Sequence, residues 1–193
     1  MAESTVFIVD DDPAVRQSLS RLMASAGLRA ETYASAGEFL DHYAPATPGC
    51  LVLDIRMPGM TGVELLEYMS ARNHHLPIII ITGHGDVPTA VRALKAGACE
   101  FLEKPFGSHA LLRMVELAIE RDARRRLIER QHREVTARFA SLTPREREVM
   151  DLVVAGEPNK VIAARLGLSQ RTVEIHRAKV MRKMRADSLP DLV

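Results

Sequence analysis

The sequence predicts an α/β fold, a doubly wound parallel sheet of five βα units, followed by an all-α domain joined to it through a helical linker. Over residues 1–122, short β-branched runs alternate with amphipathic stretches, which is typical of a parallel sheet with crossover helices. After residue 143, helix-capping signals and helical spacing replace the β-rich runs. The domains are therefore expected at 1–122 and 143–193, with the linker at 123–142.

The first half opens with the apolar run Val6–Val9, followed by a helix that begins at Pro13 and stops at Gly27. The all-apolar run Ile78–Ile81 indicates a central strand covered on both faces. Further strands are expected near 28–33, 50–53, 78–82 and 100–103, with helices in the gaps.

The linker lacks Pro and Gly from Ser108 to Thr143, and it keeps helical spacing before charged residues take over. We therefore favour a fifth helix that runs on as a charged connector, with a frayed coil as the alternative. Thr143, Pro144 and Glu146 then form a capping box that starts a helix ending at Gly156.

Two more helices follow, one over Asn159–Leu166 and one capped by Ser169 that runs to about Met184. Their separation by a tight turn at Gly167 is typical of a helix-turn-helix. A final helix should be under way at Leu192.

Composition favours a soluble cytoplasmic protein without a membrane span. Hydrophobic residues make up 47% of the chain, no apolar run approaches the ~18 residues of a span, and no export signal is visible. Cys50 and Cys99 lack metal-site spacing and are expected to be reduced thiols. Residues 1–122 carry a net charge of −6 and 123–193 one of +7. The basic half suits a nucleic acid, although a solvated basic surface would look the same.

Polar side chains follow four of the predicted strands. These residues are Asp54, Asp10 with Asp11, Thr82 and Lys104. Because the carboxyl ends of parallel strands meet at one edge of a sheet, these groups should line one cleft. Three carboxylates, a hydroxyl and an ammonium indicate phosphoryl transfer. Taken singly, each has a structural interpretation, such as the helix cap expected at Asp12.

Asp54 alone among these carboxylates leads a Gly/Pro-rich loop, so we predict that it is the nucleophile that accepts a phosphoryl group. Asp10 and Asp11 are expected to hold Mg²⁺ with Asp54 and the backbone carbonyl of Arg56. A hard divalent cation held there would offset the repulsion between a carboxylate and an anionic phosphoryl group.

Lys104 and Thr82 should contact the phosphoryl oxygens, and a cis bond to Pro105 would aim the ammonium inward. Arg56 and His84 lie two positions beyond Asp54 and Thr82. They either control the access of water to the phosphoryl group or face solvent without kinetic effect.

The last of the three predicted helices has two faces. The face expected to pack against the core consists of Val173, His176, Val180 and Met184. For His176 we favour a buried, hydrogen-bonded side chain over a contact with a base. The opposite face suits a DNA major groove, and its expected contacts are Arg171, Glu174, Ile175, Ala178 and Arg182. The flanking residues expected to contact phosphates are Lys160, Thr172, Arg177, Lys179 and Lys183.

Residues 1 to about 122 resemble the receiver domain of two-component response regulators, and 143–193 resemble the LuxR-type helix-turn-helix domain. The combination is most similar to the FixJ subgroup. The motifs that carry the resemblance are Val9-Asp10-Asp11-Asp12, Leu53-Asp54-Ile55-Arg56-Met57-Pro58-Gly59, Ile81-Thr82-Gly83-His84-Gly85 and Phe101-Leu102-Glu103-Lys104-Pro105-Phe106.

The resemblance implies that Asp54 accepts a phosphoryl group from a sensor histidine kinase and that Phe101 is a switch aromatic, turning into space vacated by Thr82. It implies a phosphorylation-controlled regulator, an activator by likeness to the subgroup. Homodimerisation on the surface of the fourth helix and fifth strand is expected. Further partners would be double-stranded promoter DNA and RNA polymerase.

Two rival functions remain at the level of sequence. Haloacid-dehalogenase-type phosphatases also use an aspartate nucleophile, but they carry an acid two residues later, where this chain has Arg56. We therefore expect no enzyme activity on phosphate esters. The other rival is a constitutive DNA-binding protein whose first half only dimerises, which the intact Asp54, Thr82 and Lys104 argue against.

Overall fold

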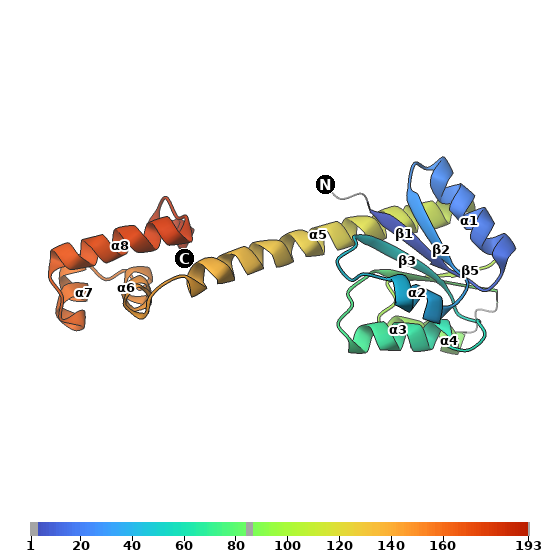
Figure 1. Cartoon of the computed structure of the whole chain (residues 1–193), viewed down its shortest axis with the longest axis horizontal. Helices are drawn as coiled ribbons and strands as arrows, with labels where there is room; N and C mark the ends of the chain where they lie inside the picture. The colour runs from blue at the N-terminus through green and yellow to red at the C-terminus, as the bar shows by residue number, and fades with distance from the viewer. Residues whose placement is uncertain (1–3, 84–86, 193) are drawn as a thin grey trace. The chain divides into compact units, whose positions relative to one another are not determined.

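The computed structural model describes residues 4–83 and 87–192, and the chain divides into two compact units, Met1–Arg126 and Leu127–Val193. The first unit is an α/β unit and the second is helical (Figure 1). Within the described residues, no helix is both long enough and apolar enough to cross a membrane.

The first unit is built on a five-stranded parallel sheet. Its strands are β1 (Thr5–Val9), β2 (Arg29–Tyr33), β3 (Gly49–Asp54), β4 (Ile78–Thr82) and β5 (Glu100–Glu103), in the order β2-β1-β3-β4-β5. Every residue of β1, β3 and β4 is buried, which confirms the prediction that the run at Ile78–Ile81 is an internal strand. The order reverses next to β1, so the strand ends of β1 and β3 flank the crevice where such sheets bind ligands.

Helices cover both faces of this sheet (Figure 1). One face packs against α1 (Pro13–Ser25) and the start of α5 (Ser108–Ala140), through a core that includes Ile8, Val52 and Leu111. The other face packs against α2, α3 and α4, through a core that includes Phe7, Phe39 and Leu66. Those helices span Ala36–His42, Gly62–Ala71 and Val87–Lys95. The alternation of Phe7 and Ile8 between the two cores is the period-2 pattern of a strand buried on both sides.

A buried carboxylate fixes α5 to the first unit. Asp122 is 1% exposed and accepts a hydrogen bond from the backbone N–H of Gly49 at 3.0 Å. Its oxygens also pair with Arg125 at 2.5 Å and Arg126 at 2.6 Å. Arg126 in turn donates to the carbonyls of 45–47. Gly49 has φ +150° and a Cβ there would meet the carbonyl oxygen of Thr5, so the sharp approach at the start of β3 requires glycine.

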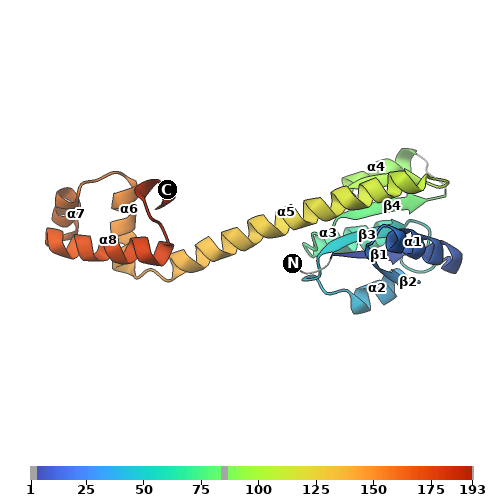
Figure 2. The same ribbon diagram turned by 90° about the horizontal axis from the view of Figure 1, so that it is seen from above.

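The second unit contains α6 (Pro144–Val154), α7 (Asn159–Leu166), α8 (Gln170–Met184) and α9 (Leu189–Leu192). The first two pack against α8 around a core that includes Val149, Ile162 and Val173 (Figure 2). The predicted capping box is present, with Thr143 and Glu146 each bonding the other's backbone N–H. The predicted cap at Ser169 is present too, and the predicted turn at Gly167 is formed with a left-handed backbone at the end of α7.

The predicted linker, residues 123–142, lies within α5 up to Ala140. Because α5 is a helix over that range, the structure favours the connector helix over the frayed coil. Contacts of Arg125 and Arg126 extend the first unit four residues past the predicted boundary at 122.

Candidate functional sites

The acidic site lies at the carboxyl edge of the sheet, as the strand ends predict. Asp10 follows β1, Asp54 is the last residue of β3, and Lys104 follows β5. Thr82, the last residue of β4, is paired in register with Glu103, so its carbonyl accepts a 2.7 Å hydrogen bond from the Lys104 backbone N–H. The parallel register therefore brings these residues to one edge although they are far apart in sequence.

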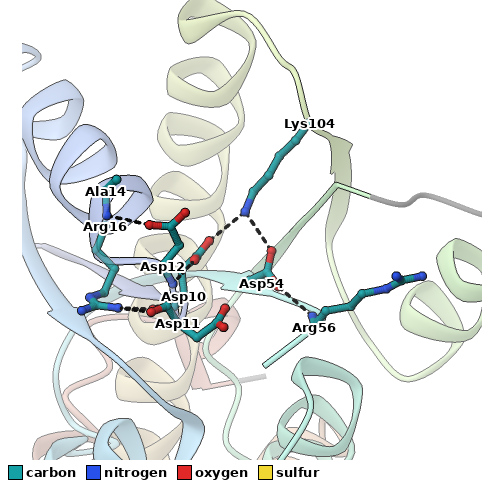
Figure 3. A network of polar contacts seen from close by, with 8 residues as sticks. All are labelled: Asp10, Asp11, Asp12, Ala14, Arg16, Asp54, Arg56 and Lys104. Carbon is teal, nitrogen blue, oxygen red and sulfur yellow. Dashed lines mark hydrogen bonds and ion pairs between the residues drawn. The ribbon is translucent and has the colours of Figure 1, made fainter. Parts of the chain in front are cut away.

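Lys104 joins the two buried carboxylates of this site (Figure 3). Its Nζ lies 2.8 Å from Asp10 Oδ2 and 2.9 Å from Asp54 Oδ1. Asp10 is 1% exposed and Asp54 6% exposed, while a quarter of the lysine side chain reaches solvent. The remaining oxygens are held by backbone, with Asp54 Oδ2 accepting from the Arg56 N–H at 2.7 Å and Asp10 Oδ1 from the Asp12 N–H at 2.9 Å. The bond between Lys104 and Pro105 is cis, as expected.

Two carboxylates sharing one ammonium leave this pocket short of positive charge. Burial raises the pKa of Asp54, and although the hydrogen bond from Lys104 lowers it, Asp10 raises it again, so the pKa stays above the ordinary value. Burial alone would lower the pKa of Lys104, but its bonds to Asp10 and Asp54 outweigh burial and raise it. Lys104 is therefore protonated at neutral pH.

The oxygen donors of this site suit a divalent cation, although their side chains are not arranged as a complete set of metal ligands. Asp10 and Asp54 offer buried carboxylate oxygens, and the side chain of Asp11 is exposed beside them (Figure 3). No group of three His, Cys, Asp or Glu side chains among the described residues is already arranged to hold a metal ion. The excess of negative charge and the all-oxygen donors nevertheless fit Mg²⁺, which takes a few carboxylates and keeps waters.

Sequence reasoning missed the residue that shapes the acidic loop. Arg16, one turn into α1, donates to the carbonyl of Asp10 at 2.6 Å and to that of Asp11 at 2.9 Å. It holds the loop between β1 and α1 while Asp12 caps the helix as predicted, accepting from the Ala14 N–H at 2.8 Å. An arginine at this place reads as ordinary helix surface, so no sequence signal pointed to it.

The predicted switch and access residues have mixed outcomes. Thr82 is buried at 1% exposure, and Phe101 is half-buried against the core that α3 and α4 cover. The side chain of Arg56 is exposed. His84 lies outside the described residues, so its predicted role stays a prediction.

Helix α8 presents the basic site of the second unit. Val173 and Val180 are buried at 0% and 1% exposure, as predicted for the core face. The opposite face is open, with Ile175 46% exposed and the side chain of Arg171 84% exposed. The other predicted contacts that are exposed are Glu174, Ala178, Lys179, Arg182 and, on α7, Lys160.

Three flanking residues have partners inside the unit. Arg177 donates to Asn159 Oδ1 at 3.0 Å, and Thr172 Oγ1 lies 2.8 Å from Ser169 Oγ. Lys183 lies 2.6 Å from Glu146 Oε2 and donates to the Ser141 carbonyl at 2.9 Å, so its ammonium serves the fold. His176 is half-buried, but its buried Nδ1 has no hydrogen-bond partner among the described residues, so the hydrogen bond expected for this side chain is missing at that atom.

Glu146 is buried at 4% exposure, and its charged form is well supported. The hydrogen bond from Lys183, followed by that from the Thr143 backbone, lowers its pKa from 4.5 to about 2. The pair Glu146–Lys183 ties the start of α6 to the end of α8, and thereby sets how α8 is presented.

Comparisons with known proteins match both units. Residues 6–116 match the model of the response regulator receiver domain, and residues 140–193 match that of the luxR family of bacterial regulatory proteins. The transcriptional regulatory protein FixJ of Azorhizobium caulinodans is 50% identical over 97% of this chain and 89% of its own length. Nodulation protein W of Bradyrhizobium diazoefficiens is 47% identical over 99% of this chain and 84% of its own length.

Solved structures agree with these matches. The response regulator StyR is similar with a TM-score of 0.95 and 47% identity, covering 100% of this chain and 97% of its own. Full-length FixJ from B. japonicum has a TM-score of 0.62 and 46% identity, covering 100% and 95%. With an aspartate-lined receiver unit and a basic helix-turn-helix unit both matched, the chain belongs to the response regulator family, as a FixJ-like, phosphorylation-controlled transcription regulator with a LuxR-type DNA-binding domain.

Proposed function

We propose that Asp54 is the residue that accepts the phosphoryl group. The observation that carries this is the pairing of Asp54 with Lys104 at the carboxyl edge of the sheet, where one carboxylate oxygen faces an ammonium. After phosphorylation, a phosphoryl oxygen can accept the hydrogen bond of this ammonium in place of the carboxylate oxygen. In the step, an Asp54 oxygen attacks phosphorus, the P–N bond of a kinase phosphohistidine breaks, and the imidazole leaves with the electron pair and takes up a proton.

The same geometry supports a Mg²⁺ site formed by Asp10, Asp11, Asp54 and the Arg56 carbonyl. When bound, the ion supplies the charge neutralisation that lets an anion approach a carboxylate. Lys104, already protonated, orients the product by its ammonium, and the Arg56 N–H keeps the second Asp54 oxygen in place.

We infer that phosphorylation is read by Thr82 and Phe101 and changes a dimerisation surface on α4 and β5. Replacing the single charge of Asp54 by a phosphoryl group draws Thr82 towards the new oxygens, and Phe101 turns inward. The surface of α4 exposes Val91 at 43% and Leu94 at 49%, which is apolar area that a second copy can cover.

DNA contacts are assigned to the open face of α8. Arg171, Glu174, Ile175, Ala178 and Arg182 are the proposed groove contacts, and Lys160, Thr172, Arg177, Lys179 and Lys183 the proposed phosphate contacts. Thr172, Arg177 and Lys183 also bond within the unit, so we expect them to contribute less than Lys160 and Lys179. The partner kinase and DNA follow from the two domains, and we further propose activation of promoters through RNA polymerase in the cytoplasm.

The experiment that tests the acceptor site is intact-protein mass spectrometry after incubation with acetyl phosphate and Mg²⁺. We expect one adduct of about 80 Da, located at Asp54 and absent from Asp54→Asn. Asp12→Asn is the matched control, because Asp12 is an exposed helix cap in the loop between β1 and α1 that also carries Asp10 and Asp11, and this variant should still take up the group. An adduct on another side chain would overturn the assignment.

The phosphatase rival is disfavoured by the position two residues after Asp54. Arg56 is there and its side chain is exposed, so this position does not supply the general acid that such phosphatases use to protonate a leaving alcohol. We expect no turnover of aryl phosphate esters above that of Asp54→Asn. Steady release of the alcohol by the wild type would restore the enzyme hypothesis.

A further inference from the structure

The end of α5 carries a stripe of exposed apolar side chains in the second unit. Ile128 is 57% exposed, Val135 51% and Phe139 39%, and the exposed His132 lies between them. The four positions are spaced by four, three and four residues. At about 100° per residue they fall within an arc of about 60°, so they form one narrow stripe along the helix.

Apart from Leu127, which is 45% exposed, the rest of this helical segment is mostly polar. Its outer positions include Arg130, Arg133 and Glu134. A β-branched pair and an aromatic ring are thus exposed to water on a helix whose other sides are mostly polar, although Phe139 has Arg147 5.1 Å from its ring on one face. Spacings that alternate between four and three residues are those of the a and d positions of a coiled-coil seam, in which such a stripe packs against another helix.

The charge pattern makes a second copy of α5 a suitable occupant. With Ile128 and Val135 at d positions and His132 and Phe139 at a positions, Glu129 is an e position and Arg124 the preceding g position. In parallel identical helices, g of one copy lies beside the following e of the other, so Arg124 and Glu129 attract twice per dimer. The next flanking pair, Gln131 and Thr136, is uncharged.

We propose that the stripe Ile128, His132, Val135 and Phe139 is a parallel, two-stranded dimer seam. The inference rests on the proposed phosphorylation-dependent dimer, since two heptads are too short to hold two chains alone. Association of the receivers raises the effective concentration of the two helices, and the seam then adds to the dimer. His132 at an a position weakens the seam, because a polar side chain there lacks apolar packing.

Disulfide trapping tests the geometry of the seam. The full chain with Cys99→Ser is phosphorylated and mildly oxidised, carrying either Val135→Cys or, as the matched control, Ala137→Cys on the opposite side of the helix. Cys50 is fully buried and stays silent. We expect Val135→Cys to form a covalent dimer in most chains and Ala137→Cys in few. Equal trapping at both positions, or none at 135, overturns the parallel seam.

Sedimentation of the phosphorylated full chain tests its strength. Val135→Glu should raise the dimer dissociation constant about tenfold or more, Ala137→Glu should leave it unchanged, and His132→Leu should lower it about tenfold. The last variant gains affinity, so a folding defect cannot imitate it. Wild-type affinity in both Val135→Glu and His132→Leu overturns the seam while leaving the proposed function intact. A wild-type chain that carries the adduct at Asp54 and stays monomeric overturns the proposed dimer itself.

Discussion

Asp54 in the first unit and Glu146 in the second are both buried carboxylates bonded to a lysine, yet their pKa values move in opposite directions. Asp54 lies 2.9 Å from Lys104 and Glu146 2.6 Å from Lys183. Burial raises the pKa of Asp54 and Asp10 adds to this, whereas Lys183 and the Thr143 backbone lower that of Glu146 to about 2.

The difference lies first in burial, which is the largest influence on the pKa of Asp54 but is outweighed by hydrogen bonds at Glu146, and then in the neighbouring charges. Lys104 divides its charge between two carboxylates, while Lys183 serves Glu146 alone and otherwise meets a neutral carbonyl. Asp54, which shares its lysine with a second carboxylate, is suited to binding a cation or to being modified, as a phosphoryl acceptor requires. Glu146, whose charge is fully compensated, holds two helices together and gains nothing from modification.

The contrast between Asp54 and Glu146 predicts its largest effect, a loss of stability of the second unit, when Lys183 is removed. Lys183→Met leaves the Glu146 carboxylate buried without its cation, which costs 3–5 kcal/mol for a fully buried pair; because 29% of the lysine side chain is exposed, we expect about 2–3 kcal/mol. Hydrogen exchange of peptides from 144–184 in the full chain measures the loss. Lys179→Met, one turn earlier and exposed, should cost almost nothing. Equal losses in both would mean that the pair is not a special support.

Lowering the pH should have opposite effects on the stability of the two units. Because the pKa of Glu146 is lowered, its contribution is present above about pH 4.5 and is lost as the pH falls towards about 2, at a cost on the order of 2–3 kcal/mol. The pKa of Asp54 is raised, so ionisation of Asp54 destabilises the first unit, and that penalty is relieved as the pH falls towards 3.8. Methyl NMR of Val173 and Val52 in the full chain reads the units separately. In Glu146→Gln the acid loss in the second unit should vanish.

DNA affinity should depend on many exposed charges of the second unit, whereas phosphorylation in the first unit should depend on Asp54 alone. Lys160→Ala combined with Lys179→Ala should weaken binding about tenfold and reduce the slope of log affinity against log salt by about 2, because both lysines are proposed phosphate contacts. Fluorescence anisotropy over a salt series measures both. Arg21→Ala, which removes an exposed charge on α1 of the first unit, is the control. An unchanged slope in the double variant would remove these residues from the interface.

The smallest predicted effect is a gain in stability. Asp54→Asn removes one of two carboxylates that share Lys104, so we expect the first unit to become more stable at neutral pH by on the order of 1 kcal/mol. Urea unfolding followed at the methyl group of Val52 measures it. Asp12→Asn should show no gain, and a loss in Asp54→Asn would contradict the crowding of this site.

Local signals in the sequence predicted the sheet and the acidic cleft. Each cleft residue ends an apolar run, so Asp54 and Lys104 were placed by the strands themselves, 50 residues apart. The bond between Asp122 and Gly49 spans 73 residues, and that between Lys183 and Glu146 spans 37. Nothing local marks these pairs, because Asp122 and Lys183 lie on helices that look like solvated surface. Lys183 was therefore read as a DNA contact.

The ion pairs of Asp122 also decide where the chain can be cut. Because Arg125 and Arg126 are engaged with Asp122 and Arg126 with the carbonyls of 45–47, trypsin should spare them and cleave first at Arg130 or Arg133. A receiver fragment released by protease should thus keep the first turn beyond residue 122. A fragment trimmed to residue 121 would lose the ion pairs of Asp122 with Arg125 and Arg126, and it would leave the Gly49 N–H without its acceptor.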